Sequence, residues 1–430
     1  MSVSKTTTLI PAKAMQLNKW QREDTTWMLS LYGTAIGAGI LFLPIDVGLG
    51  GIWPVIVMLV FAFPMTYFSH RALCRFVLSG SLTTHDVTTV AEEHFGRWIG
   101  KFLTFLYCFS IYPVLLMYCV ALTNTVENFI VNQLNLVAWP RSLIAVTLVT
   151  SFMIIIRFGQ DVIIKSVSIL VYPFVAILVL LSFYLVPYWN CAILQYKSSN
   201  IDGNNFSSVL MTIWMVIPVM VFSFNHTSII SSFAIAQKQS YGKHAEHKSV
   251  WILKYSHILM VTTVIFFAVS CIFSLSPYDL ALAKKQNITI LSYLANHFKA
   301  PIINYIAPVL AFIAITKAFF GHYLGACEGI NGLLFKFYIK ERKLNPKNTQ
   351  YLIDLFIFLS CWLTATINPS ILRMIEILGG PIIAVLLYLM PMYAIHTIPV
   401  LQKYKHPWQS IFICIMGFIA ISAIIHGYFC

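Results

Sequence analysis

Long apolar runs, separated by short polar stretches, follow one another along almost the whole chain. A transmembrane helix needs about 20 predominantly apolar residues, and runs of that kind recur throughout the sequence. This pattern predicts eleven spans, at 27–48, 52–78, 99–130, 140–156, 165–187, 208–232, 251–275, 303–332, 351–367, 370–397 and 408–428. The pattern therefore predicts an all-α polytopic membrane protein with eleven transmembrane helices.

The composition agrees with a membrane protein. The mean hydropathy is +0.79, and 59% of the residues are hydrophobic while only 10% are charged, which is far from the values of soluble domains. About two dozen polar residues precede the first apolar run and no small-residue cleavage site follows it, so we expect a retained helix and not a signal peptide. The nine cysteines include no C-x-x-C pair, and no metal site, disulfide framework or cofactor is predicted.

The net charge of +13 raises the possibility of a nucleic-acid partner, but the distribution of the charge favours a membrane. Most of the 28 lysines and arginines fall in the tail and in every second loop, as expected for the cytoplasmic side of a membrane protein. We therefore predict a cytoplasmic N-terminus and, with eleven spans, a C-terminus on the outer side.

The first predicted span contains an unusual glycine pair. Its centre reads Ala35, Ile36, Gly37, Ala38 and Gly39. Two glycines around one alanine let the backbone leave helical geometry, and the polar groups freed in this way are tolerated in a membrane only where they line a polar cavity. Close helix packing is the alternative reason for such glycines.

The sixth predicted span contains a second candidate break. Pro218 removes a backbone donor, and Ser223, Phe224, Asn225 and His226 begin a stretch that is too polar to face lipid. Interrupted helices at corresponding positions of two halves are the best sequence indication of the binding site of an inverted-repeat transporter.

The two breaks lie five spans apart, in the first and the sixth span, which predicts two inverted five-helix repeats and one extra helix. The predicted segments are a cytoplasmic tail at 1–24 whose end, Asp24 and Thr25, caps the first helix, a first repeat at 25–188, an outer loop at 189–207, a second repeat at 208–398 and an eleventh helix at 399–430.

The ends of broken helices indicate the kind of solute. A half-helix N-terminus favours a carboxylate, and a C-terminus with free carbonyl groups favours an ammonium group. Two such breaks side by side suit an amino acid. Tyr112, near the middle of the third span, is a candidate to face the cavity, and Ser223, Asn225 and Thr316 are candidates to bind a substrate hydroxyl.

Two ionisable residues are candidates for proton coupling. Lys317 is the one formally charged residue between positions 300 and 327, and a lysine at that depth costs about 3 kcal/mol on insertion scales. It either gains and loses a proton during transport or is held permanently by backbone carbonyls. His226 is the rival proton carrier, because the pKa of histidine lies near neutrality. Near the outer end of the tenth span, Arg373 and Glu376 are expected to pair with each other.

Several strings are familiar. LYGTAIGAGILFLPI, IPVMVFSFNHTSIISSFAIA, ITILSYLANHFKAP, AITKAFFGHYLGACEG and NPSILRMIEILGGPIIAVLLYLMPMYAI resemble the hydroxy/aromatic amino acid permeases of bacterial inner membranes, which belong to the amino acid–polyamine–organocation superfamily. The likeness covers nearly the whole chain and is greatest to the members that carry serine.

This resemblance implies a LeuT-like fold and import of L-serine driven by protons. It also implies that the substrate backbone binds at Ala35 to Gly39 and at Ser223 to His226, and that Lys317 replaces a sodium ion. Threonine/serine or aromatic amino acid symport stays open as an alternative, as does a sensor that binds an amino acid without moving it. An enzyme is not expected, because the G-x-S-x-G and H-E-x-x-H motifs are absent.

Overall fold

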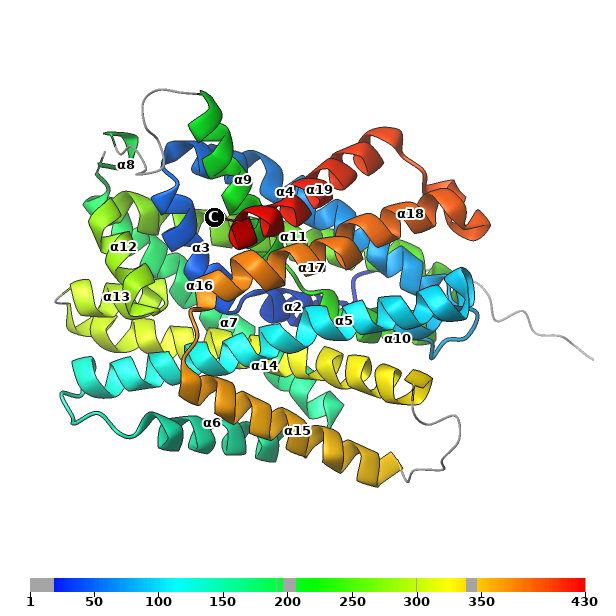
Figure 1. Cartoon of the computed structure of the whole chain (residues 1–430), viewed down its shortest axis with the longest axis horizontal. Coiled ribbons are helices and arrows are strands. Elements are labelled where there is room, and N and C mark those ends of the chain that lie inside the picture. Colours follow the sequence, from blue (N-terminus) through cyan, green and yellow to red (C-terminus); the bar gives the residue numbers. More distant parts are fainter. Residues whose placement is uncertain (1–18, 191, 196–205, 299, 338–345, 430) are drawn as a thin grey trace, which may run out of the picture.

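A computed structural model describes residues 19–190, 192–195, 206–298, 300–337 and 346–429. All secondary structure in this part of the chain is helical (Figure 1). The helices of the first half are α2 (Arg22–Ala35), α3 (Ala38–Leu49), α4 (Ile52–Leu78), α5 (Val87–Asn128), η1 (Phe129–Gln133), α6 (Arg141–Ile156), α7 (Gln160–Leu185), η2 (Val186–Tyr188) and α8 (Ala192–Gln195).

The second half begins with α9 (Phe206–Ser223), α10 (Thr227–Tyr241), η3 (Gly242–His244), α11 (Ala245–Ser274), α12 (Pro277–Gln286), α13 (Ile290–His297) and α14 (Pro301–Phe337). It continues with α15 (Pro346–Ile367), α16 (Ile371–Met374), η5 (Ile375–Gly379), α17 (Gly380–Ala384), η6 (Val385–Leu389), α18 (Met390–Thr397), η7 (Pro399–Tyr404) and α19 (Pro407–Phe429). The elements η5 and η6 are π-helical turns that interrupt one long helical path.

Seven helices in the described part of the chain are long and apolar enough to cross a membrane, or eight when the bent pair α2 and α3 counts as one span. The predicted spans 140–156, 208–232 and 408–428 correspond to shorter apolar helices, which are Arg141–Ile156, Val209–Ser223 and Pro407–Ala423. The prediction of an all-helical polytopic membrane protein is confirmed. The count of eleven spans and the inverted repeat stay predictions.

Both predicted helix breaks are present. The first one separates α2 from α3, which meet at an angle of 51°. Ile36 is extended and Gly37 has φ −140° and ψ −149°, so neither continues the helix. The second break separates α9 from α10, where Phe224, Asn225 and His226 lie outside helical geometry.

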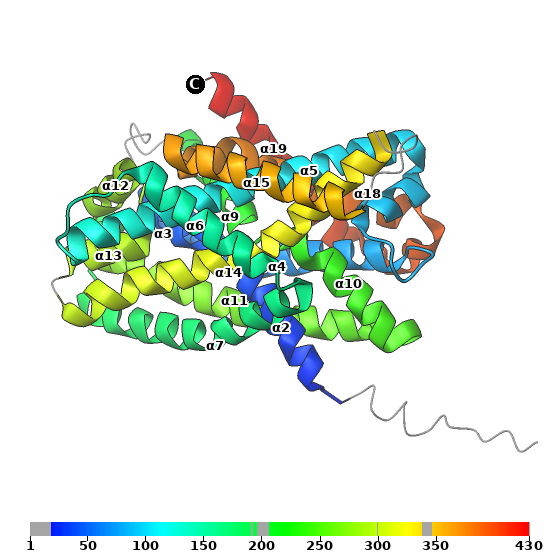
Figure 2. The same cartoon turned by 90° about the horizontal axis from the view of Figure 1, so that it is seen from below.

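Figure 1 shows α5 and α14 running side by side along the length of the molecule, with α6 and α15 packed beyond them. The helices α4, α9, α17 and α19 pack together on the side of α5 away from α14. In the view of Figure 2, α7, α11 and α2 cover the face opposite to α15 and α6. The first break therefore lies inside the bundle, where α2 contacts both α7 and α14.

The start of the first helix differs from the prediction. The helix α2 begins at Arg22, and Asp24 lies within its first turn, where it accepts a hydrogen bond from the backbone N–H of Gln21 at 2.9 Å. The Asp24 carboxylate is fully buried and pairs with the Lys248 ammonium group of α11 at 2.8 Å. This contact fastens the start of α2 to α11. Most of the predicted tail, 1–18, lies outside the described residues.

Candidate functional site

The two helix breaks touch each other. The Ser223 hydroxyl, at the end of α9, donates a hydrogen bond to the Gly39 carbonyl oxygen at 2.9 Å. A Cβ atom at position 39 would lie 2.9 Å from the Ser223 Cα atom and 2.7 Å from the Phe222 ring. Glycine at this position is therefore required by the close approach of the second break to the first.

The polar groups of the second break are largely paired within the protein. The Asn225 side-chain oxygen accepts hydrogen bonds from the Thr227 backbone N–H at 3.0 Å and from the Thr227 hydroxyl. The backbone N–H of His226 donates to the Nε2 atom of His70 at 3.2 Å. Phe224 is buried, and its N–H donates to the Met220 carbonyl. Neighbouring side chains thus hold the break in one conformation.

The first break is built differently. Ala35, Ile36 and Ala38 are buried, and α3 begins at Ala38 without a capping side chain. A Cβ atom at Gly37 would lie 2.4 Å from the Cβ atom of Ala318 on α14 and 3.0 Å from the Tyr118 ring on α5. The uncapped first turn of α3 presents N–H groups and the positive end of a helix dipole inside the bundle, which favours a carboxylate.

Three buried hydroxyls near the breaks have no hydrogen-bond partner among the described residues. They belong to Thr34, Ser228 and Thr316. Thr34 lies against α14 at Gly321, and Ser228 lies against the same helix at Gly325, one helical turn further along. Buried hydroxyls normally find a partner, so this region is suited to bind a polar ligand. The sequence prediction included Thr316 but missed Thr34 and Ser228. Both lie within strings that the sequence analysis quotes around the two breaks, LYGTAIGAGILFLPI and IPVMVFSFNHTSIISSFAIA.

Lys317 lies in the interior beside the first break. Its side chain is fully buried, and the Nζ atom has no hydrogen-bond partner among the described residues. The Nζ atom lies 3.8 Å from the centre of the Phe174 ring of α7, a cation–π distance. Among these residues no backbone carbonyl holds the amine, so the alternative of a lysine fixed by carbonyl groups receives no support.

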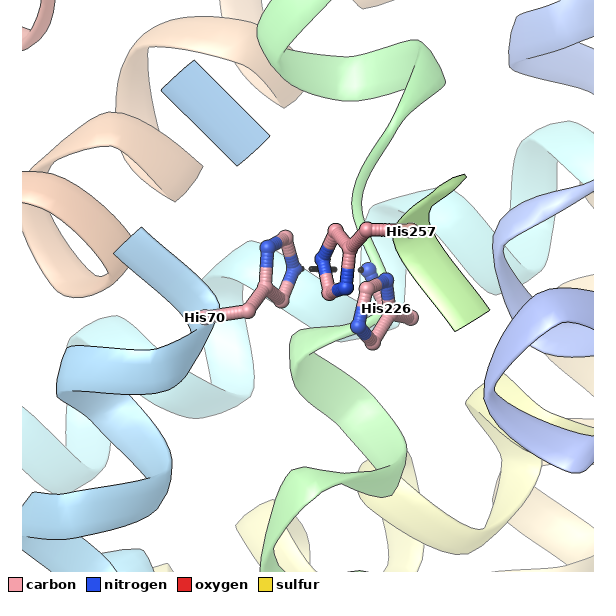
Figure 3. A group of neighbouring side chains, drawn as sticks. All are labelled: His70, His226 and His257. Carbon is pink, nitrogen blue, oxygen red and sulfur yellow. Dashed lines mark hydrogen bonds between the residues drawn. The ribbon is translucent and has the colours of Figure 1, made fainter. Parts of the chain in front are cut away.

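His226 belongs to a cluster of three buried histidines that the sequence prediction did not assemble. His70 comes from α4 and His257 from α11, and one ring nitrogen of each of the three residues lies within 4.8 Å of the other two (Figure 3). Imidazole is a frequent ligand of zinc and copper. However, the His70 and His226 rings are stacked at 3.7 Å with an angle of 7° between their planes, and in-plane lone pairs of parallel rings do not converge on one ion.

The predicted tyrosine is not at the breaks. The Tyr112 hydroxyl donates to the Ser360 hydroxyl, and the ring stacks on Phe356, so the side chain faces α15. Tyr118 of the same helix lies next to Gly37 and meets the His322 ring edge-on at 5.0 Å. Tyr118 is therefore the tyrosine of α5 that borders the first break.

A second correction concerns Glu376. Its carboxylate pairs with the Lys284 ammonium group of α12 at 3.3 Å, and the same ammonium group lies 3.8 Å from the Asp46 carboxylate of α3. The expected pair between Arg373 and Glu376 is absent from the ion pairs of the described residues. One cation thus connects three elements, α12, α3 and η5, at the same end of the bundle.

Cavities are present near both ends of the bundle. One of about 670 Å³, near α13, is lined by many amides, among them Asn124, Asn128, Gln133 and Asn296. Another of about 610 Å³ is lined by residues that include Glu328 of α14.

Long apolar helices with two polar breaks and a buried lysine are typical of membrane transport proteins. The sequence profile of the tryptophan/tyrosine permease family matches residues 26–428, and the chain belongs to this family of permeases. The predicted family resemblance is confirmed, and the chain is not an enzyme.

The relatives are similar over their full lengths. The serine transporter SdaC of Escherichia coli strain K12 is 52% identical over 430 residues, which cover 100% of both chains. SdaC of Shigella flexneri is 51% identical with the same coverage. The threonine/serine transporter TdcC of Escherichia fergusonii is 45% identical and covers 99% of this chain and 100% of its own length.

Proposed function

We propose that this protein is a secondary active transporter that imports L-serine together with protons across the bacterial inner membrane. The observation that carries the proposal is the contact between the two helix breaks, where the Ser223 hydroxyl bonds to the Gly39 carbonyl beside buried hydroxyls without partners. Full-length relatives named as serine transporters, at 52% and 51% identity, support the choice of substrate.

The proposed topology has eleven spans, arranged as two inverted repeats of five and one extra helix. Eight spans come from the long helices with the bent pair counted once, and the three shorter apolar helices complete the set. The distribution of basic residues supports a cytoplasmic N-terminus. In this topology α12, α13 and the Lys284 ion pairs lie at the outer side, and the cavity with Glu328 lies at the cytoplasmic side.

The proposed substrate pose follows from the ends of the broken helices. The serine carboxylate binds at the uncapped N-terminus of α3, and the ammonium group binds at carbonyl groups of the helix ends that face it. The free hydroxyls of Thr34, Ser228 and Thr316 are available for the serine hydroxyl. Ser223 and Asn225 serve mainly to shape the site, since both already make hydrogen bonds within the protein.

Lys317 and His226 are the two proposed coupling residues. Both are fully buried and lack side-chain hydrogen-bond partners among the described residues. A buried amine or imidazole whose exposure to water changes during transport can bind a proton on one side and release it on the other.

The test is uptake of labelled L-serine into sodium-free proteoliposomes, under counterflow and under an imposed pH gradient, for the native chain and for Lys317→Ala. We expect the native chain to concentrate serine only with the pH gradient. Serine uptake without dependence on that gradient would refute proton coupling. A Lys317→Ala variant that exchanges serine but no longer concentrates it identifies Lys317 as a coupling residue, whereas parallel loss of both assigns it a structural or substrate-binding role.

Threonine/serine transport is the second candidate function. The 45% identity to TdcC over the full chain favours it, because threonine differs from serine by one methyl group and a small pocket discriminates weakly at that scale. Competition of unlabelled threonine and of aromatic amino acids in the counterflow assay separates these substrates. Exchange of any amino acid in that assay also separates a transporter from a sensor.

A further inference from the structure

The buried histidine cluster, His70, His226 and His257, has a defined hydrogen-bond pattern. The Nδ1 atom of His70 lies 2.8 Å from the Thr66 carbonyl oxygen, which can only accept, so Nδ1 carries the hydrogen. The Nε2 atom of His70 accepts the backbone N–H of His226. Both ring nitrogens of His70 are therefore hydrogen-bonded, and the neutral imidazole has no free lone pair for a further proton.

The other two rings keep free nitrogen atoms. The Nδ1 atom of His257 donates to the Leu253 carbonyl oxygen at 2.6 Å, which leaves the Nε2 lone pair without a partner in the described part of the chain. Neither ring nitrogen of His226 has a partner there. The two rings lie 4.9 Å apart between centroids, with their planes tilted by 54°, and Figure 3 shows them next to each other. The two rings can share one added proton as an N–H···N hydrogen bond once a nitrogen atom of His226 and the Nε2 atom of His257 are about 3 Å apart.

The surroundings favour a proton over a metal cation. Among the described residues, no carboxylate contacts the cluster, so a divalent ion would lie in the interior without compensating charge. Tyr67 of α4 lies 5.8 Å from the His257 ring between centroids. The other titratable groups of the surrounding elements are His322 of α14, which acts electrostatically on His226, and Tyr388 of η6, which interacts with Ser69, the sequence neighbour of His70. A single proton adds one charge, and two imidazoles can spread that charge between them.

The cluster is also mechanically connected to the second helix break. His226 is the last residue of the break, and its backbone N–H is bonded to His70. A movement of the His226 ring toward His257 therefore also displaces the His226 backbone, which is part of the break. Binding of the proton and the conformation of the second break are therefore coupled at His226.

We propose that the transported proton is bound between His226 and His257, while His70 holds the break in register. On the outer side a ring-nitrogen lone pair accepts the proton from a hydronium ion, which breaks one O–H bond and forms one N–H bond. On the cytoplasmic side the reverse transfer breaks the N–H bond and returns the proton to water. This inference rests on the proposed function as a proton symporter, and of the two proposed coupling residues it assigns the transported proton to His226.

The test is calorimetric titration of the detergent-solubilised full-length protein with L-serine at pH 7.5, in buffers with different ionisation enthalpies. The slope of the measured heat against buffer enthalpy gives the number of protons taken up per serine bound. We expect a value near one for the native chain and near zero for His257→Gln. The matched control is His247→Gln, on the exposed side of the same helix, for which we expect the native value.

Transport gives the second measurement. A one-to-one symporter concentrates serine about tenfold per unit of pH difference, and we expect His257→Gln to lose this accumulation to a much greater extent than counterflow exchange. A proton uptake near one in a serine-binding His257→Gln variant would overturn the assignment. If that variant does not bind serine, His226→Gln is titrated in its place with the same criterion. Absence of proton uptake in the native chain would instead refute the proposed symport itself.

Discussion

Removal of the Lys284 ammonium group by a Lys284→Gln substitution tests whether the ion pairs of α12 keep the proposed outer side of the bundle closed. The Nζ atom lies 3.3 Å from Glu376 and 3.8 Å from Asp46. Burial acts to lower the pKa of Lys284, but the Asp46 and Glu376 carboxylates outweigh it and raise the pKa above its ordinary value. While the two carboxylates are ionised, the contribution of the ion pairs is therefore complete below the ordinary lysine pKa, and at the alkaline end it is lost as the pH rises through the raised value.

The magnitude follows from the exposure of the side chain. The Lys284 side chain is 43% exposed, so each contact has the value of a surface ion pair, about 0.2–1 kcal/mol. Loss of two such contacts destabilises the closed outer side by about 1 kcal/mol. Since 1.4 kcal/mol corresponds to a factor of ten, we expect the ratio of closed to open molecules to fall about fivefold.

The assay measures the distance across the outer side directly. Spin labels at Tyr278 of α12 and Arg373 of α16, both exposed, in a background without the native cysteines, report the fraction of open molecules by pulsed dipolar spectroscopy. We expect Lys284→Gln to increase the population at longer distances. Lys284→Arg, which keeps the charge, and Lys285→Gln, which removes the neighbouring charge, are the controls.

Two results would refute the reasoning about the outer side. One is a distance distribution in Lys284→Gln that equals the native one. The other is an equal shift in Lys285→Gln, because this would show that net charge and not the specific ion pairs controls opening.

Three further substitutions test the packing of the bundle and of the site. Gly325→Ala places a Cβ atom 2.7 Å from the Ser228 Cβ atom and 2.9 Å from its backbone, and we expect a loss of about 1–3 kcal/mol from overpacking, measured as a lower melting temperature; an unchanged value would contradict the close contact. Lys248→Met strands the buried Asp24 carboxylate and should cost about 3–5 kcal/mol, with recovery in the double variant that also carries Asp24→Asn. Ser223→Ala removes the hydrogen bond between the two breaks, worth about 1 kcal/mol, and should raise the KM for serine several-fold at unchanged expression; an unaltered KM would argue against this contact as part of the site.

The positions of both helix breaks could be predicted because their causes are local. Gly37 and the polar stretch from Ser223 weaken helix formation or lipid contact wherever the rest of the protein lies. For the same reason Lys317 was identifiable as a buried functional candidate, since its neighbours in the sequence are apolar. Local composition also indicated a polytopic membrane protein, and the resemblance of the quoted strings indicated the family to which the chain belongs.

The orientation of side chains around a helix was harder to predict. Tyr112 and Tyr118 are six residues apart on α5, and at about 100° per residue their side chains point in directions about 120° apart. Hydropathy alone did not reveal which of the two faced the break. The structure places Tyr118 beside Gly37 and Tyr112 against Ser360.

The sequence by itself determined the elements of this protein: the apolar helices, the two places where they break, and the buried lysine. Only the tertiary structure decided which of them meet, as with Ser223 on Gly39, the gathering of His70, His226 and His257, and the pairing of Glu376 with Lys284. The physical reason is that helix formation and membrane insertion depend on neighbours in the sequence. Contacts between helices depend instead on packing among segments that are far apart along the chain.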